Sequence, residues 1–506
     1  MNVRALLRGS LLYTLGNFLP RVGAFLLLPV YAAAMAPSEF GVLSLMLSLA
    51  GLLAIVYRLG LDGALLRLHF DVAPRRRPSL YLSSALTTLA AAVALSIVIG
   101  LLAAPVFPRI FPGVAFVPYG VIVLALTITT SLQYIPAVLF RAGERPDRFL
   151  TYSSGIFVLG TAATLFFLLV LQRGAGGALA GQLVGGVGVV AVTALILLRM
   201  PRPRFDAGLV RQSLRFGLPL VPHGVAAWVL NLSDRLLIGL LIGLPTLGTQ
   251  AAIGIYSFGY VLGQGVALVA LSFNAAWVPF WYARGEGERG PVLLREVTTL
   301  SMGGLAFLTV AAATLAPEVT RLFASLRWGF SARAAGDVIV VVSLASLIYG
   351  LYFMLVSTIF LRRRTAGLPL LTLAAGAANV ASNLVLIPRF GIAGAAWSTV
   401  VGYGTLTALT WWYAARDYPI ALDLRRLAVL GIAVIAAILL ARLVRWEEAG
   451  LWASTGFHLG VTAAFALVLV PLLLGPMGRL RALLAGERQA GTPVGAVTMS
   501  DPEEHP

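Results

Sequence analysis

Long apolar runs alternate with short polar connections along the whole chain. Each run has roughly 18 to 31 residues, the length that a helix needs to cross a bilayer at about 1.5 Å per residue. We count about fourteen such runs and predict an all-α, polytopic membrane protein. The connections leave no room for a separate soluble domain. The predicted spans are 11–35, 41–59, 79–104, 116–139, 149–171, 177–198, 216–244, 251–281, 297–316, 337–361, 366–388, 391–414, 426–443 and 455–474.

The run 216–244 is apolar enough to span a bilayer, yet it contains Asp234 and Arg235. A charge near the bilayer midplane costs about 2.5–3.5 kcal/mol on the scale of insertion experiments. This helix is therefore expected to face protein or a water-filled cavity. Helical spacing places Asn231 and Asp234 on one face, with Arg235 beside it. The two charges either pair and lock the helix to its neighbours, or form a polar wall of a transport pathway.

Two short motifs recur with almost the same offset. The segment around Gly41, FGVLSL, is similar to the segment around Gly254, IGIYSF. The segment that begins at Gly174, GAGGA, is similar to the one that begins at Gly391, GIAGA, and the two offsets are 213 and 217 residues. Because six spans separate the copies, both halves begin on the same side of the membrane and the repeat is parallel. We expect two six-helix repeats around a central cavity.

The repeat divides the chain into four parts. In equivalent places, the first and seventh helices line the gap between the two lobes, and they carry Arg21 and Arg235. The end of the chain is rich in Gly, Pro and acidic residues and is expected to be a disordered cytoplasmic tail. The parts are an N-terminal lobe, a C-terminal lobe, two additional transmembrane helices and the tail, at residues 1–200, 201–418, 419–478 and 479–506.

The amino-acid composition excludes several classes of function. Hydrophobic residues make up 59% of the 506 residues, charged residues make up 11%, and the mean hydropathy is +0.92. The net charge of +17 comes from arginine alone, because the sequence has no lysine, and the lysine-dependent phosphate loop of ATPases is therefore excluded. The sequence has no cysteine, which excludes disulfides and cysteine-ligated metals. We expect no cofactor.

The arginines gather in alternate connections. With the N-terminus in the cytoplasm, the inner segments carry 27 arginines, the outer loops carry 8, and 2 lie within spans. The positive-inside rule therefore predicts that both termini are cytoplasmic. Topology and contact with anionic lipids account for the basic charge, so we expect the lipid bilayer as a partner and no nucleic acid.

Five further polar residues lie in or beside the spans. Arg21 is a candidate ligand for an anion, or else it reaches the interface or caps a buried carbonyl. Arg58 and Asp62 lie where the second span reaches the cytoplasmic face. Asp62 either acts as a gate of the transport pathway or pairs with an arginine. Arginine suits a pyrophosphate because its planar fork donates two parallel hydrogen bonds. Asn274 and Asn379 offer amides to a sugar, or they bond neighbouring helices together.

Enzyme activity is not expected. A polysaccharide polymerase or ligase in a membrane would present catalytic residues on a large outer loop, and the predicted outer loops are short. The HExxH and GxSxG patterns do not occur in the sequence. A scaffold without transport activity would give no reason for charges at the midplane.

Eight blocks of the sequence occur in the order of a known family. The blocks are 37–45, 59–67, 216–219, 232–235, 254–257, 379–383, 386–392 and 394–397. With them the chain resembles, over roughly residues 5–475, the bacterial polysaccharide-transport flippases. These form the O-antigen or oligosaccharide branch of the multidrug/oligosaccharidyl-lipid/polysaccharide exporter superfamily. Members of the family often use lysine as well as arginine, whereas this chain uses arginine alone.

The resemblance implies a multi-pass protein of the bacterial inner membrane. It would move an undecaprenyl-pyrophosphate-linked oligosaccharide, such as an O-antigen, capsule or exopolysaccharide repeat unit, to the outer leaflet by alternating access. Arg21 and Arg235 would be cavity cations, with Asp62 and Asp234 as their partners or as coupling carboxylates. An ion gradient, of H⁺ or Na⁺, or the membrane potential would drive transport. A polysaccharide polymerase or glycosyltransferases would be partners.

Two related transporters remain as alternatives. A flippase for the peptidoglycan lipid precursor shares the fourteen-span plan, but its early helices usually carry more arginine than this first lobe. A cation-coupled drug exporter of the same superfamily would favour acidic residues in its cavity and normally has twelve spans.

Overall fold

The structure is entirely helical in the part of the chain that it describes. This computed structural model covers residues 3–242, 246–323, 325, 332–443 and 450–489, and its regular elements are all helices. Thirteen helical segments of the described residues are long and apolar enough to cross a membrane. The all-α, polytopic fold class predicted from the sequence is confirmed.

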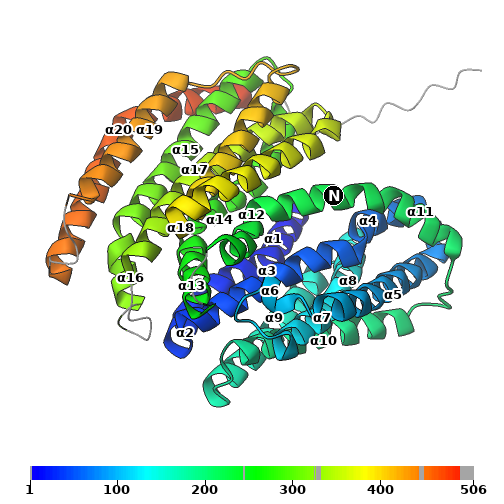
Figure 1. Ribbon diagram of the computed structural model, residues 1–506. Coiled ribbons are helices and arrows are strands. Elements are labelled where there is room, and N and C mark those ends of the chain that lie inside the picture. Colours follow the sequence, from blue (N-terminus) through cyan, green and yellow to red (C-terminus); the bar gives the residue numbers. More distant parts are fainter. Residues whose placement is uncertain (1–2, 243–245, 324, 326–331, 444–449, 490–506) are drawn as a thin grey trace, which may run out of the picture.

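The helices form two groups that follow the two halves of the chain. The first half contains α1 (Val3–Leu26), α2 (Leu28–Ala34), α3 (Pro37–Arg58), α4 (Leu61–Asp71), α5 (Arg77–Ala103), α6 (Phe107–Ile110), α7 (Val121–Ser131), α8 (Tyr134–Ala142), α9 (Pro146–Leu165) and α10 (Gly174–Leu198). The second half contains α11 (Ala207–Gly217), α12 (Val221–Leu241), α13 (Thr246–Gly263), α14 (Gly265–Arg284), α15 (Gly290–Thr314), α16 (Ala316–Phe323), α17 (Ala332–Leu361), α18 (Leu368–Ala414), α19 (Leu424–Ala441) and α20 (Leu451–Gln489). In Figure 1 the green helices α11 to α13 connect the blue and cyan group to the yellow and orange group.

One apolar segment, Thr365–Ala414, was predicted as the two spans 366–388 and 391–414. Its 50 residues would extend about 75 Å as a straight helix, more than twice the roughly 30 Å of a hydrocarbon core. The backbone of α18 breaks at Gly391, where φ is 57° and ψ is −134°. Beyond this break the chain folds back on itself. This is shown by a hydrogen bond across the break, in which Nδ2 of Asn379 donates to the carbonyl oxygen of Ser398 at 3.0 Å. The break therefore falls where the sequence placed the end of a span.

The N-terminal end of α3 packs closely against the middle of α13 through two glycines. A Cβ on Gly41 would overlap the carbonyl oxygen of Gln250, and a Cβ on Gly254 would overlap the carbonyl oxygen of Pro37. Each carbonyl lies four residues before the opposite glycine, so the contact is reciprocal. Gly41 and Gly254 are the pair that the sequence repeat aligns, and their packing is the one that a pseudo-twofold relation requires. The lobe boundaries themselves stay a prediction.

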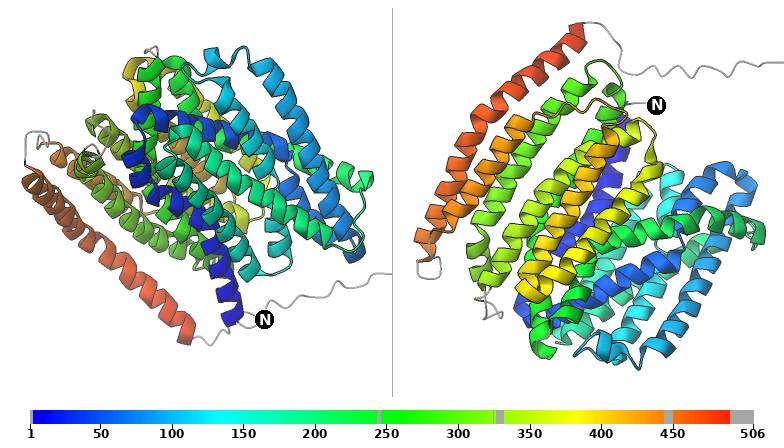
Figure 2. Two further views of the ribbon diagram at one scale, coloured as in Figure 1. Left: turned by 90° about the horizontal axis from the view of Figure 1, so that it is seen from below. Right: turned by 45° about the horizontal axis from the view of Figure 1, so that its top comes forward.

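An apolar core joins the two halves at this contact. It contains Met46 of α3, Ile253 of α13 and Val342 of α17, all without exposed surface. Separate cores lie within the first half, around Leu65, and within the second half, around Leu294. Figure 2 shows α1, in deep blue, between the two groups of helices.

The last two helices, α19 and α20, pack against α15 at the edge of the second half. Arg479 fixes α20 there, because its Nε and Nη2 donate to the two carboxylate oxygens of Glu296 at 2.7 and 2.9 Å. The tail predicted to begin at residue 479 is helical as far as Gln489, since this ion pair holds the chain against α15. That part of the prediction is wrong, and residues 490–506 lie outside the described residues.

Candidate functional site

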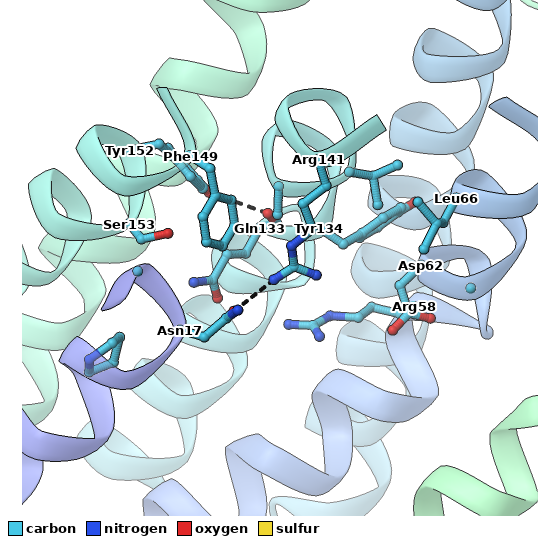
Figure 3. Close-up of a pocket in the computed structure, with 15 residues that line it drawn as sticks. Asn17, Arg58, Asp62, Leu66, Gln133, Tyr134, Arg141, Phe149, Tyr152 and Ser153 are labelled. Atoms are coloured by element: carbon cyan, nitrogen blue, oxygen red, sulfur yellow. Dashed lines mark hydrogen bonds between the residues drawn. The ribbon is translucent and has the colours of Figure 1, made fainter. Parts of the chain in front are cut away.

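A polar cavity of about 420 Å³ lies inside the first half, between α1, α3, α4, α8 and α9 (Figure 3). Its volume is typical of small-molecule sites. It is lined by Gly16, Asn17, Pro20, Arg58, Asp62, Gly63, Leu66, Gln133, Tyr134, Ala137, Val138, Arg141, Phe149, Tyr152 and Ser153.

Two arginines reach this cavity from different helices. Arg58 ends α3, and Arg141 lies in the last turn of α8. Nη2 of Arg141 donates to Oδ1 of Asn17 on α1 at 2.7 Å, and its guanidinium lies 4.6 Å from the ring centre of Phe149. Nη2 of Arg58 donates to the carbonyl oxygen of Thr130 at 3.3 Å, while its Nε is buried without a hydrogen-bond partner among the described residues. Figure 3 shows both guanidinium groups facing the same space.

The charge of the cavity is unbalanced. Asp62 borders the cavity near Arg58, so two positive charges face one negative charge. Within the described ranges, neither guanidinium forms an ion pair with a carboxylate. Two like charges that converge without a partner repel each other, and an anion with several oxygen acceptors relieves that repulsion. The arrangement is therefore suited to bind a phosphate-type group.

A tight turn between α3 and α4 positions Arg58 and Asp62. Leu59 and Gly60 both take left-handed conformations, with φ of 51° and 69°. Gly60 is required for a second reason, because a Cβ there would overlap the carbonyl oxygen of Gly217 at the end of α11. The turn breaks the helix between Arg58 and Asp62, so that both reach the rim of the cavity.

A second polar cluster surrounds Asp234, which is 0% exposed on α12. Its Oδ1 accepts a hydrogen bond from Nδ2 of Asn383 at 2.9 Å, and its Oδ2 accepts from the hydroxyls of Tyr256 and Thr399. Oδ1 of Asn379 accepts from Asn383 at 3.2 Å, and Oδ1 of Asn383 is buried without a partner in the described part of the chain. Carboxylate, amide and hydroxyl oxygens are the ligands of hard cations, so this cluster is suited to hold a monovalent cation or a proton.

Arg235 is separated from Asp234 although the two are adjacent in sequence. It is 4% exposed, and its Nη1 donates to the carbonyl oxygen of Asn231 at 3.1 Å. Its guanidinium lies 4.0 Å from the ring centre of Tyr260 and 5.2 Å from that of Tyr256. Consecutive residues of a helix point about 100° apart, so Asp234 meets the hydroxyl of Tyr256 whereas Arg235 meets its ring. In this conformation Arg235 is neither paired with Asp234 nor open to a cargo, because aromatic rings surround its charge.

The other predicted residues are placed as follows. Oδ1 of Asn231 accepts from the hydroxyl of Tyr403 at 2.8 Å, in the same buried region as Asp234. Arg21 is exposed on α1, directly after Pro20 of the cavity wall. Asn274 is half-buried on α14, and its Oδ1 has no partner among the described residues. The structure thus brings Arg58 and Asp62 to one site, groups Asn231, Asp234 and Asn379 at another, and leaves Arg21 and Asn274 outside both.

Sequence reasoning missed residues that complete each site. Arg141 was counted among the arginines that set topology, because it lies at the end of a span like many others. Asn17 and Thr399 are single polar residues in apolar helices, a signal that was available. Tyr256 lies in the repeated motif around Gly254, where it was treated only as part of the repeat.

The fold, the open polar cavity and the buried polar cluster define a multi-pass membrane protein with a transporter architecture. It matches a structure of the lipid II flippase MurJ in an inward closed conformation, with a TM-score of 0.71 at 11% identity, over 92% of this chain and 100% of that one. It also matches an inward-facing multidrug resistance MATE family transporter of the MOP superfamily, with a TM-score of 0.59 at 14% identity, over 80% of this chain and 94% of that one.

Sequence comparison gives the family. Residues 6–282, more than half of the chain, match the polysaccharide biosynthesis protein family. The chain belongs to this family, as its resemblance to the polysaccharide-transport flippases predicted. Comparison with curated proteins gives no match.

Proposed function

We propose that this protein is a flippase for an undecaprenyl-pyrophosphate-linked oligosaccharide. It works in the inner membrane, with both termini in the cytoplasm, and moves its cargo to the outer leaflet by alternating access. The observation that carries this proposal is the convergence of Arg58 and Arg141 on one cavity, where no carboxylate of the described residues pairs with either. Membership of the polysaccharide biosynthesis family supports the identity of the cargo.

The diphosphate is the part of the cargo that this cavity fits. A diphosphate offers several oxygen acceptors, and two guanidinium forks contact it from different helices. Asn17 and Arg141 link α1 to α8, so an anion bound at Arg58 and Arg141 draws α1, α3 and α8 together. The sugar chain then lies in the gap beside α1, where Arg21 is exposed, and the polyprenyl tail stays in the bilayer.

The cluster at Asp234 supports a role for Na⁺ or H⁺ as the coupling ion. Its carboxylate is buried in the second half and receives three neutral donors, so a cation there would neutralise a charge that forms no ion pair within the described residues. The chain has no lysine for a phosphate loop, which favours an ion gradient or the membrane potential as the energy source. A glycosyltransferase must supply the lipid-linked cargo, and a polymerase or transferase must consume it.

A flipping assay tests the proposal. The purified protein is reconstituted in liposomes that contain an undecaprenyl-diphosphate-linked oligosaccharide with a fluorophore on its sugar. Loss of fluorescence to an impermeant quencher then reports the transfer of cargo between leaflets. Arg58→Gln combined with Arg141→Gln should slow this transfer at least tenfold, which corresponds to about 1.4 kcal/mol.

The matched control is Arg67→Gln. The Arg67 side chain is 66% exposed on α4 and pairs with Asp71, so its loss should leave the rate unchanged. A double variant at Arg58 and Arg141 that flips the cargo as fast as the unmodified protein would show that neither arginine takes part in transport. Cargo that does not cross with the unmodified protein would show that the substrate class is wrong.

A further inference from the structure

Helix α13 carries two contacts, two residues apart, that belong to different parts of the molecule. Gly254 packs against α3 of the first half, backbone to backbone. Tyr256 is 0% exposed and donates its hydroxyl to Oδ2 of Asp234 on α12. One short segment of α13 therefore touches both the junction between the halves and the proposed ion site.

We propose that Tyr256 is a positioning residue that couples occupancy of the Asp234 site to the separation of α3 and α13 at Gly41 and Gly254. This inference rests on the proposed function, in which the halves alternate and a cation binds at Asp234. By the predicted topology, the glycine contact lies at the outer side of the membrane. Its separation would open the space between the two halves to that side.

The coupling follows from competition for one oxygen atom. Oδ2 of Asp234 accepts from both Tyr256 and Thr399, so a cation or proton that takes up a lone pair of this oxygen weakens the bond from Tyr256. The hydroxyl is fully buried and must then find another acceptor, because an unpaired buried donor is unfavourable. Rotation of the ring or a shift of α13 provides one.

The surroundings of Tyr256 favour a shift of the helix. The guanidinium of Arg235 lies against the rings of Tyr256 and Tyr260 and restrains ring rotation. Tyr256 and Arg235 are the charged and titratable groups that act on Asp234 from α12 and α13, Tyr260 is a more distant one, and α18 contributes Asn383 and Thr399. Because no side chain separates Gly254 from α3, a small shift of α13 is enough to break the contact at Gly41.

The absence of native cysteine makes this inference directly measurable. Ala36→Cys, just before α3, and Ala251→Cys, near the start of α13, place one spin label on each side of the glycine contact. The full-length protein in nanodiscs is compared with Na⁺ or an impermeant organic cation at constant ionic strength, and at neutral and acidic pH. Pulsed electron resonance gives the distance distribution, and thermal unfolding reports whether the cation still binds.

In the otherwise unmodified protein, Na⁺ or acid should shift the distribution toward longer distances. Tyr256→Phe keeps the ring beside Arg235 and removes the hydroxyl, so it should keep the stabilisation by the cation and lose the shift. Tyr260→Phe is the matched control, one turn further along the helix under the same guanidinium. Its distance distribution should shift as that of the unmodified protein does.

A Tyr256→Phe variant whose distance distribution still shifts would overturn the inference. An unmodified protein whose distance distribution changes with neither Na⁺ nor acid would overturn it too. Asp234→Asn gives an independent test, since it should lose the stabilisation and the shift together. A retained shift in this variant would also contradict the coupling. The distance measurement uses no lipid-linked cargo, so its failure is distinguishable from failure of the flippase assay.

Discussion

Gly174 and Gly391 both have a positive φ, of 52° and 57°, at equivalent points of the two halves. Gly174 begins α10, and Gly391 divides α18 where its second part begins. In each half the chain reverses direction at this glycine and enters the last helix of the six. A conformation that L-residues rarely adopt is thus used twice for the same turn.

The turn at Gly391 should be sensitive to a single methyl group. Gly391→Ala forces a Cβ into a conformation with φ of 57° and ψ of −134°, which should destabilise the protein by about 1–3 kcal/mol. Gly404→Ala is the control in the same helix, because a Cβ there meets open space. Thermal unfolding in detergent measures both, and equal melting temperatures would contradict the role of the backbone angle.

The ion pair between Arg479 and Glu296 should hold the C-terminal helices in place. Glu296 is 1% exposed and Arg479 is 44% exposed, so Arg479→Ala leaves a buried carboxylate without its cation. We expect a loss of about 2 kcal/mol, below the value for a fully buried pair because solvent screens this one. Arg442→Ala breaks the exposed pair with Asp337 and should cost less than about 1 kcal/mol. The reverse order in chemical denaturation would refute this assignment.

The start of α11 should loosen in acid. Asp206 caps this helix through the N–H of Leu209, and the hydrogen bond from Arg76 together with this cap lowers the pKa of Asp206. Because the pKa is lowered, these contacts stabilise the helix above the ordinary pKa of aspartate, and the stabilisation is lost as the pH falls through the lowered value. The protection factors of α11 against hydrogen exchange, which correct for the intrinsic effect of pH, should fall over that range. In Asp206→Asn they should be lower at neutral pH and no longer depend on acid.

Transport should lose its dependence on the driving ion when Asp234 is neutralised. Asp234→Asn keeps the shape of the side chain but removes the charge that would bind Na⁺ or H⁺. In liposomes with an imposed gradient, this variant should flip cargo at the same slow rate with and without the gradient. Asp417→Asn, in the exposed pair with Arg364, should respond to the gradient like the unmodified protein. A gradient response retained by Asp234→Asn would place the coupling site elsewhere.

The sequence predicts the helices and their repeat well because both depend on local patterns. Apolar runs of bilayer length define the spans, and the two motifs align Gly41 with Gly254 and Gly174 with Gly391, the glycines that occupy corresponding places in the structure. The sites were harder because they depend on which side chains meet. Arg141 cannot be distinguished from a topology signal until α8 is seen beside α1.

Arg235 shows the opposite difficulty. Its charge in an apolar helix was recognised, but the ring of Tyr260 that surrounds it comes from another helix. Sequence spacing placed Arg235 beside Asp234, and only the packing of α12 against α13 and α18 separates their surroundings. An intramembrane charge therefore marks a polar region of this protein without saying which ligand or side chain meets it.

Binding of the lipid carrier tests the central claim most directly. The full-length protein in nanodiscs is titrated with undecaprenyl diphosphate and with undecaprenyl monophosphate, which differ only at the head group. We predict that the unmodified protein and Arg67→Gln bind the diphosphate at least tenfold more tightly. The combined Arg58→Gln and Arg141→Gln variant should lose that preference while its binding of the monophosphate changes less. A double variant that retains the full preference for the diphosphate would contradict the account.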